Sequence, residues 1–404
     1  MADKYSDGMM QGPAGKVSLA VMSEQIKDVA LENGACSAGI STIESLAGGP
    51  PSTNLEYVME DARAAVTFAV PFDQDHVRNF LAKRDRHGHQ SDQNITNTMA
   101  SGIAGQVASY LEQFGAKSAA VMANAVYRHD EDSRYIQQLP DLSHRYLAAR
   151  CGLGWFGFSG NVLTPEHGPN VVFATAVTEA PLLADEPLAE EDNYCDDCNA
   201  CNASCPSGFF RYGKHDKLTV TMGGHEFSYA NRRDYARCTY VCAGYNGLNP
   251  NGRWSTWSPG RFPIPRDDKE MKAAYRQAIP AFQRRRSPPG TVNKNPMVFG
   301  YYGRDLATTC GNCSLVCHPD REERDRRIAS LRQGGVVVQH DDGRLEAMSP
   351  DEARAFVAAM PREKREDFEF VETEAEPKAT AGGSSSNSAA KAPLPRPAAD
   401  ASKR

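Results

Sequence analysis

Residues 193–208 read NYCDDCNACNASCPSG, and their four cysteines follow the spacing C-x2-C-x2-C-x3-C before a proline: Cys195, Cys198, Cys201 and Cys205. Short two-residue spacings let one turn of chain place three thiolates around one inorganic core. In two-cluster ferredoxins the fourth cysteine of such a run binds the neighbouring core. The stretch therefore predicts iron–sulfur chemistry and a region that is organised around metal.

A second run, CGNCSLVCHP, supplies Cys310, Cys313 and Cys317. By the ferredoxin rule, the first site consists of Cys195, Cys198, Cys201 and Cys317. The second site then holds Cys205, Cys310 and Cys313, and it lacks one ligand because a complete run would need a cysteine at Ala307. Cys238 and Cys242, in RRDYARCTYVCAG, are the two cysteines that remain to close it. Eight thiolates predict two [4Fe–4S] clusters.

Zinc is the main alternative for these cysteines, because two C-x2-C pairs can bind one ion tetrahedrally. Zinc does not require the third and fourth cysteines of the first run, nor the proline. Disulfides are disfavoured, since the N-terminus MADKYSDGMMQGPAGK shows no apolar signal core and no twin-arginine pair, and we expect a cytoplasmic protein. Cys36 and Cys151 stand apart from the runs and are expected to be small buried residues.

The composition is that of an ordinary globular chain. Its 404 residues carry 45 Lys and Arg against 51 Asp and Glu, a net charge of −6. No basic block is present, which makes a nucleic-acid partner unlikely by charge alone. No run of about 18 apolar residues occurs, so no transmembrane helix and no membrane partner are expected.

The chain divides into segments of different character. Residues 1–16 look like a flexible N-terminus. Residues 17–185 alternate expected helices (17–33, 94–114) with expected strands (64–70, 118–122, 171–177), which predicts an α/β (α+β) domain. Residues 186–320 carry the cysteine runs, with an insert at 207–309 that contains an expected hairpin turning at Gly223-Gly224. Residues 321–372 are a charged helical extension with Ser349 as an N-cap, and 373–404 a disordered tail.

The stretch before the first run is LSHRYLAARCGLGWFGFSGNVLTPEHGP, residues 142–169, followed by a strand and TEAPLLADEP. This order resembles the corrinoid-dependent iron–sulfur reductases, namely the epoxyqueuosine reductases and the reductive dehalogenases. The matching motifs are Cys151–Trp155, Leu163–Gly168 and Thr178–Leu182, and ARAAVTFAVPF (62–72) is similar to the family's first strand. Downstream, RRDYARCTYVC is similar to the dehalogenase segment that supplies the distant ligand, which favours Cys238 over Cys242.

The resemblance implies a nitroreductase-like domain that holds base-off cobalamin, followed by a ferredoxin-like module with two [4Fe–4S] clusters. Glycines would allow close approach of the corrin and polar side chains would bind its amide arms, and the residues expected to do so are Gly152, Gly154, Gly157, Asn161, Thr164 and His167. Candidate proton donors are Tyr135, Asp141 and His144. A basic residue that the family often carries after the glycine turn is replaced here by Phe158.

The function expected from this combination is a cytoplasmic cobalamin-dependent reductase, similar to the reductive dehalogenases, acting on a small organic molecule. An external low-potential carrier of the ferredoxin or flavodoxin type would supply its electrons. Two alternatives remain: a two-cluster electron-transfer protein serving a partner enzyme, and an epoxyqueuosine reductase-like enzyme of tRNA modification. Trp254 and Trp257, in the insert, could line a substrate channel or form a lid over a cluster.

Overall fold

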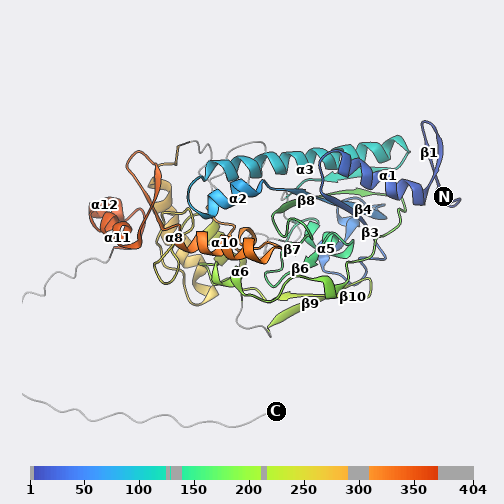
Figure 1. Cartoon of the computed structure of the whole chain (residues 1–404). Helices are drawn as coiled ribbons and strands as arrows, with labels where there is room; N and C mark the ends of the chain where they lie inside the picture. Colours follow the sequence, from blue (N-terminus) through green and yellow to red (C-terminus); the bar gives the residue numbers. More distant parts are fainter. Residues whose placement is uncertain (1–3, 124–127, 129–138, 211–215, 290–308, 372–404) are drawn as a thin grey trace, which may run out of the picture. The chain divides into compact units, whose positions relative to one another are not determined.

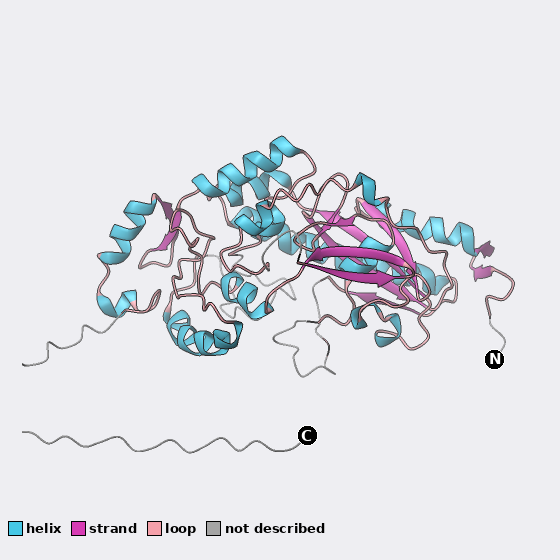
Figure 2. Ribbon diagram, turned by 90° about the horizontal axis from the view of Figure 1, so that it is seen from below, coloured by secondary structure: helices cyan, strands magenta, loops and turns pink. Residues whose placement is uncertain are grey.

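A four-stranded sheet with the order β3-β4-β8-β5 forms the centre of the N-terminal half (Figures 1 and 2). The computed structural model describes residues 4–123, 128, 139–210, 216–289 and 309–371. The described residues up to Phe370 belong to one compact unit. The expected tail and Tyr135 lie outside the described residues.

All neighbouring strands of this sheet run antiparallel, so the domain is α+β within the predicted mixed class. The strands at 64–70, 118–122 and 171–177 were expected, whereas the first strand of the sheet was missed because Ser, Gly and Thr dilute its apolar pattern. The observed strands are β3 (Ser37–Thr42), β4 (Ala64–Pro71), β5 (Ser118–Val121) and β8 (Val171–Thr178).

The two faces of β4 pack against different elements, as the two-residue period of a strand requires. Ala64, Val66, Phe68 and Val70 point into the larger core with α1 (Leu19–Glu32) and α3 (His87–Gln113). Ala65 and Ala69 point to the opposite face, towards α5 (His144–Arg150). Figure 1 shows α1 and α3 along one side of the sheet and α5 on the other. The sheet therefore separates its two long helices from the segment that carries the glycine-rich turn.

Helix α3 begins seven residues before the expected 94, since its polar first turns include the buried His89 and Gln90. A short helix, α2 (Gln74–Leu81), precedes it. The N-terminus also differs from the expectation of a flexible start, because it contains a hairpin of β1 (Met9–Gly12) and β2 (Gly15–Ser18). Met10 of this hairpin is buried in the larger core, which fixes the segment.

The expected hairpin of the insert is confirmed as β9 (Lys217–Met222) and β10 (His225–Ala230). Gly223 and Gly224 have φ of +55° and +83°, the left-handed conformation that a two-residue turn of this kind needs. A smaller hairpin of β6 (Trp155–Phe156) and β7 (Val162–Leu163) frames the glycine-rich turn.

The cysteine-bearing region contains short helices joined by long irregular segments: α6 (Ala200–Ala203), α7 (Tyr235–Cys242), α8 (Met271–Arg284) and α9 (Asn312–Leu315). Beyond it lie α10 (Arg321–Gln333), β11 (Val336–Gln339), β12 (Leu345–Met348), α11 (Pro350–Ala358) and α12 (Arg362–Arg365). Single 3-10 turns occur at Pro51–Thr53, Leu55–Tyr57, Glu190–Asp192 and Asp268–Glu270. Ser349 caps α11 in a reciprocal pair with Glu352, which confirms the expected N-cap.

Trp254 and Trp257 are buried in a core formed with α2, α9 and α10, and they do not line an open channel. The indole Nε1–H of Trp257 donates to the carbonyl oxygen of Phe80 at 3.0 Å. This core includes Ala200 and Val316, which adjoin two cysteine ligand candidates in sequence, so the lid interpretation fits better. Within the described residues, none of the helices combines the length and the apolar character that crossing a membrane requires.

Candidate functional site

The first cysteine run folds as a tight loop that leads into the short helix α6. Asp197 and Asn199 adopt left-handed φ values of +50° and +61°, which are uncommon for residues other than glycine. These two positions reverse the chain between successive cysteines. The loop can therefore direct Cys195, Cys198 and Cys201 towards one point, as the spacing predicted.

The first group of thiols consists of Cys195, Cys198, Cys201 and Cys317. Burial raises the pKa of Cys201 to about 12, and the neighbouring Cys317 and Cys195 raise it as well. Burial and Cys195 likewise raise the pKa of Cys317 to about 12. Cys317, the member of this group that is distant in sequence, is held by Asn170. The Asn170 side-chain amide donates to the carbonyl oxygen of Cys317 at 2.9 Å. Cys317 thus lies near enough to Cys195 and Cys201 to affect their charge, although it is more than a hundred positions away in sequence, and the four-ligand set stays a prediction.

The second group gathers Cys205, Cys238, Cys310 and Cys313. Burial raises the pKa of Cys205 to about 11, while a 3.1 Å hydrogen bond with the Ser207 hydroxyl lowers it. Burial raises the pKa of Cys313 well above its ordinary value, and Cys238, Cys205 and Cys310 add to the effect. In both groups burial and neighbouring thiols thus favour the protonated form, and a bound cation would have to replace these protons.

Cys242 is a fifth thiol beside the second group. Its sulfur lies 3.7 Å from that of Cys238, one turn away on α7. The hydrogen bond from Cys242 lowers the pKa of Cys238, and this bond together with one to Cys310 raises the pKa of Cys242. Of this pair, Cys242 therefore favours the protonated form and Cys238 the thiolate form that a metal ligand needs.

The two groups meet at the glycine-rich turn. Phe158, Phe209, Phe210 and Ala230 form a buried cluster that contacts cysteines of both groups: Cys195, Cys201, Cys205, Cys238 and Cys313. The backbone N–H of Phe158 donates to the sulfur of Cys195 at 3.2 Å. Phe158, which replaces the expected basic residue, thus forms the apolar wall between the turn and both thiol groups.

The glycines of this turn are explained by the packing of the chain itself. A Cβ at Gly152 would collide with the carbonyl oxygen of Glu186, and one at Gly154 with that of Leu163. A Cβ at Gly157 would collide with the Leu163 side chain. The Thr164 hydroxyl donates to the carbonyl oxygen of Gly168 at 2.9 Å, and His167 lies 3.8 Å from the Glu166 carboxylate. All five of these residues, which were expected to contact a corrin, contact other residues of this chain instead.

Two side-chain amides behave differently. Among the described residues, the Asn161 Nδ2 and Asn170 Oδ1 atoms are buried and have no hydrogen-bond partner. Leaving a buried polar atom unpaired costs about 1–3 kcal/mol. These two atoms are therefore the polar groups of the turn that a ligand would satisfy.

Of the expected proton donors, the structure describes His144 and Asp141. His144 uses both ring nitrogens, Nδ1 with the Thr175 hydroxyl at 2.8 Å and Nε2 with the carbonyl oxygen of Met122 at 3.1 Å. Burial lowers its pKa to about 4, so the ring is neutral at pH 7. Asp141 is half-buried just before α5.

Sequence reasoning missed Tyr229 and Arg232, which form a polar network with Tyr146 beside Phe158. The hydroxyls of Tyr146 and Tyr229 lie 2.6 Å apart. The Arg232 guanidinium lies 5.0 Å from the Tyr229 ring, donates to the Ser159 carbonyl oxygen at 2.8 Å and donates to the Tyr235 hydroxyl at 2.6 Å. The turn thus receives its positive charge from Arg232, six residues before Cys238. The basic pair in RRDYARC was the available signal.

Two features now define the class of protein: an antiparallel α+β domain, and a module in which distant cysteines converge beside a glycine-rich turn. No family model matches the chain. It is 32% identical over 137 residues to an epoxyqueuosine reductase of Bacillus anthracis, covering 28% of this chain and 35% of that protein. It is 38% identical over 93 residues to the tetrachloroethene reductive dehalogenase of Sulfurospirillum multivorans, covering 23% of this chain and 19% of that protein.

Solved structures of the same two kinds of enzyme match the chain at low similarity. A reductive dehalogenase described for B12-dependent dehalogenation is 19% identical with a TM-score of 0.43, over 58% of this chain and 31% of that one. An epoxyqueuosine reductase bound to a modified tRNA stem loop is 15% identical with a TM-score of 0.37, over 58% and 60%.

The resemblance to the superfamily of epoxyqueuosine reductases and reductive dehalogenases is confirmed by these sequence relatives, all named as reductases. The chain spans about a third of the length of the epoxyqueuosine reductase that it matches. Both kinds of enzyme are represented among the sequence relatives. The expectation that nucleic acid is an unlikely partner rests on net charge alone, and these relatives do not confirm it.

Proposed function

We propose that this chain is an iron–sulfur reductase in which two [4Fe–4S] clusters pass electrons to cobalamin at the glycine-rich turn, where a small organic substrate is reduced. Residues 17–185 would form the cofactor and substrate domain and residues 186–320 the cluster module. The observation that carries the proposal is the convergence of two thiol groups on Phe158 of the turn. Electrons would leave the clusters towards the cobalamin at this position.

The number and spacing of the cysteines support clusters over zinc. Eight cysteines supply four ligands for each of two clusters. The spacing C-x2-C-x2-C-x3-C-P of the first run is that of iron–sulfur ligands, whereas zinc does not require its third and fourth cysteines.

Support for cobalamin comes from the relatives and from two side chains. The glycines do not form an open cradle, whereas the unpaired amides of Asn161 and Asn170 fit hydrogen bonds to the amide arms of a corrin. When bound, the corrinoid supplies a low-valent cobalt centre as the reductant of the substrate. The chain would contribute the two amides, an apolar wall at Phe158, and a source of protons.

The proton source that the geometry favours is the Tyr146–Tyr229 pair. Burial and the hydrogen bond with Tyr229 raise the pKa of Tyr146, so the hydroxyl stays protonated at pH 7. Arg232, next to Tyr229, would stabilise the phenolate left after a proton is donated. Tyr135, Asp141 and His144 stay predictions from sequence, and the hydrogen bonds of His144 suit a structural role.

The test is anaerobic purification followed by metal analysis and a visible spectrum. The proposal expects about eight iron atoms and about one cobalt per chain, with corrinoid either retained or reconstituted. About eight iron atoms with no corrinoid bound under any condition would overturn the reductase proposal. That result would leave the two-cluster electron-transfer protein. Zinc in place of iron would overturn both.

Reduction of epoxyqueuosine in tRNA is the second candidate function, and the Bacillus anthracis relative supports it as well as the dehalogenase supports the first. The loaded protein should be assayed with an epoxyqueuosine-containing tRNA stem loop and with halogenated small organic compounds, using the same reductant. Turnover of the stem loop alone would assign the chain to tRNA modification. Turnover of a halogenated compound alone would assign it to the dehalogenase branch.

A further inference from the structure

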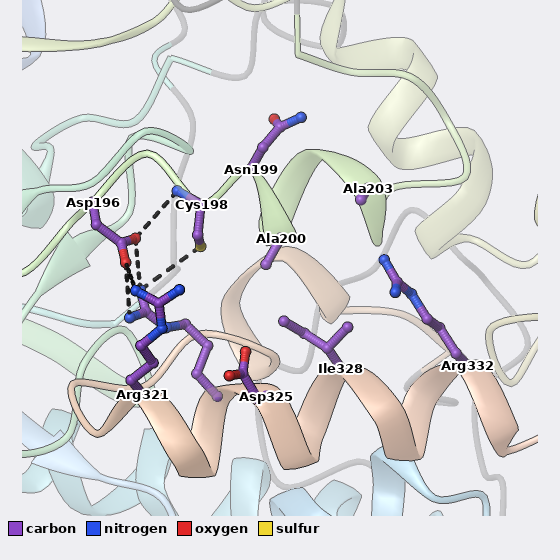
Figure 3. Close-up of a pocket in the computed structure, with 10 residues that line it drawn as sticks. Asp196, Cys198, Asn199, Ala200, Ala203, Arg321, Asp325, Ile328 and Arg332 are labelled. Carbon is purple, nitrogen blue, oxygen red and sulfur yellow. Dashed lines mark hydrogen bonds and ion pairs between the residues drawn. The ribbon is translucent and has the colours of Figure 1, made fainter.

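Cys198 differs from every other cysteine of the chain in its exposure. It is exposed, Cys151 is buried, and the other nine are half-buried. Cys198 lies on the wall of a cavity of about 310 Å³ between the first cysteine loop and the outer face of α10. Figure 3 shows Cys198 and Ala200 on one side and Arg321, Asp325, Ile328 and Arg332 on the other. One thiol of the first group is thus reachable from solvent.

Arginines dominate the charge of this cavity. Arg324 donates to both carboxylate oxygens of Asp196, at 3.1 and 3.3 Å, and to the Cys198 sulfur at 3.7 Å. Arg321 also donates to Asp196 at 3.3 Å, and its side chain is 74% exposed. Arg332 is exposed at the other end of the cavity. The lining therefore holds three guanidinium groups against two carboxylates, Asp196 and Asp325, in a chain whose net charge is −6.

We propose that this cavity is the docking site of the external electron donor, and that the donor is a small redox protein with an acidic surface around its cofactor. This inference rests on the proposed function, because it requires a cluster held by Cys195, Cys198, Cys201 and Cys317. Electron transfer between proteins slows steeply with distance, so electrons enter where a cluster ligand reaches the surface. Cys198 is that ligand, and the arginines select a partner of opposite charge.

The transfer is a one-electron step. The donor's reduced cofactor would lose one electron, and a cluster held by Cys198 would gain it. The Arg324 guanidinium, hydrogen-bonded to the Cys198 sulfur, would offset part of the added negative charge. Arg332 is exposed, and Arg321 is 74% exposed although it is paired with Asp196, so both side chains can reach carboxylates of the donor. Asp196 is held by two arginines, so it does not repel an acidic surface.

The experiment measures how fast the reduced donor bleaches the visible absorption of the clusters in the iron-loaded protein, by anaerobic stopped flow. Reduced flavodoxin is the acidic probe, and a small photoreduced deazaflavin is the reductant that needs no docking site. The double variant Arg321→Glu, Arg332→Glu should react with flavodoxin about tenfold more slowly or worse at low salt. Its rate with deazaflavin should be unchanged. Added salt should slow the reaction of the unmodified protein, as expected for attraction.

The matched control is Lys16→Glu, the reversal of an exposed positive charge on β2, in the N-terminal hairpin. It should react with flavodoxin as the unmodified protein does. Equal flavodoxin rates for the double variant and the unmodified protein, with normal iron content in both, would overturn the docking site while leaving the proposed function intact. Absence of bound iron in the unmodified protein would overturn the proposed function and the docking site together.

Discussion

At the residue scale, one turn of α7 separates two thiols that compete for a single ligand position. Cys238 adjoins Phe158 and the other thiols of the second group, while Cys242 contacts Cys238 and Cys310 from outside that cluster of side chains. Their sulfurs are 3.7 Å apart, which is too near for both to occupy separate corners of one cubane. We therefore predict that Cys238 is the ligand and that Cys242 donates a hydrogen bond to it.

Replacing these two cysteines one at a time separates the roles. Cys238→Ala should leave about four iron atoms per chain, since the second cluster loses a ligand, whereas Cys242→Ala should retain about eight. The two variants are purified anaerobically, and their iron and acid-labile sulfide are measured per chain. The reverse pattern would make Cys242 the ligand.

At the element scale, α10 is fixed by a buried carboxylate. Glu323 accepts hydrogen bonds from Arg327 at 2.9 Å, from Arg326 at 3.1 Å, and from Arg78 of α2 at 2.7 Å. The side chains of Glu323 and Arg327 are 5% and 1% exposed. Arg327 also donates to Gln74 at 2.7 Å and to the carbonyl oxygen of Leu315. This network holds the helix of the proposed docking site against α2 and α9.

Glu323→Gln should lower the free energy of unfolding by roughly 3–5 kcal/mol at pH 7, because it leaves Arg327 as a buried charge without its anion. Glu322→Gln, at an 88% exposed position on the same helix, should change it by less than about 0.5 kcal/mol. Urea unfolding of the iron-loaded variants measures both. Similar losses for the two substitutions would show that the network does not fix α10.

The Glu323 carboxylate should also make the stability of the fold fall as the pH is lowered. Burial alone would raise the pKa of Glu323, but hydrogen bonds from Arg327, Arg78 and Arg326 outweigh it and lower the pKa to about 2. A folded pKa below the ordinary 4.5 stabilises the fold above pH 4.5, and the gain is lost as the pH falls towards 2. The stability difference between the unmodified protein and Glu323→Gln should therefore shrink by about 2–3 kcal/mol over that range. A stability difference between the two proteins that stays constant over this pH range would contradict the low pKa of Glu323.

At the scale of the whole molecule, the two halves of the chain differ in what holds them together. The sheet and its helices have a continuous apolar core that includes Ile26, Phe68 and Val107. The cysteine region has short helices and thiols that repel one another once ionised. A cluster would neutralise these thiolates and join residues that are far apart in sequence.

Removing iron should therefore loosen one half selectively. After anaerobic chelation, amide hydrogen exchange should speed up roughly tenfold or more across residues 193–242 and 309–320, and change little in β3, β4 and β8. A sample taken through the same buffers without chelator is the control. Equal acceleration in the sheet would show that the clusters hold the whole unit together.

The sequence by itself predicted how the cysteines divide between two sites, because ferredoxin-type spacing indicates which thiols share a site. It also located three of the four strands of the central sheet, the insert hairpin and the Ser349 cap, since apolar runs, Gly-Gly and Ser-x-x-Glu act over a few residues. Only the tertiary structure brought Arg232 to the glycine turn, joined Tyr146 to Tyr229 and left Cys198 exposed beside the arginines of α10. Each of these contacts joins residues far apart in sequence, and their positions depend on how the elements pack.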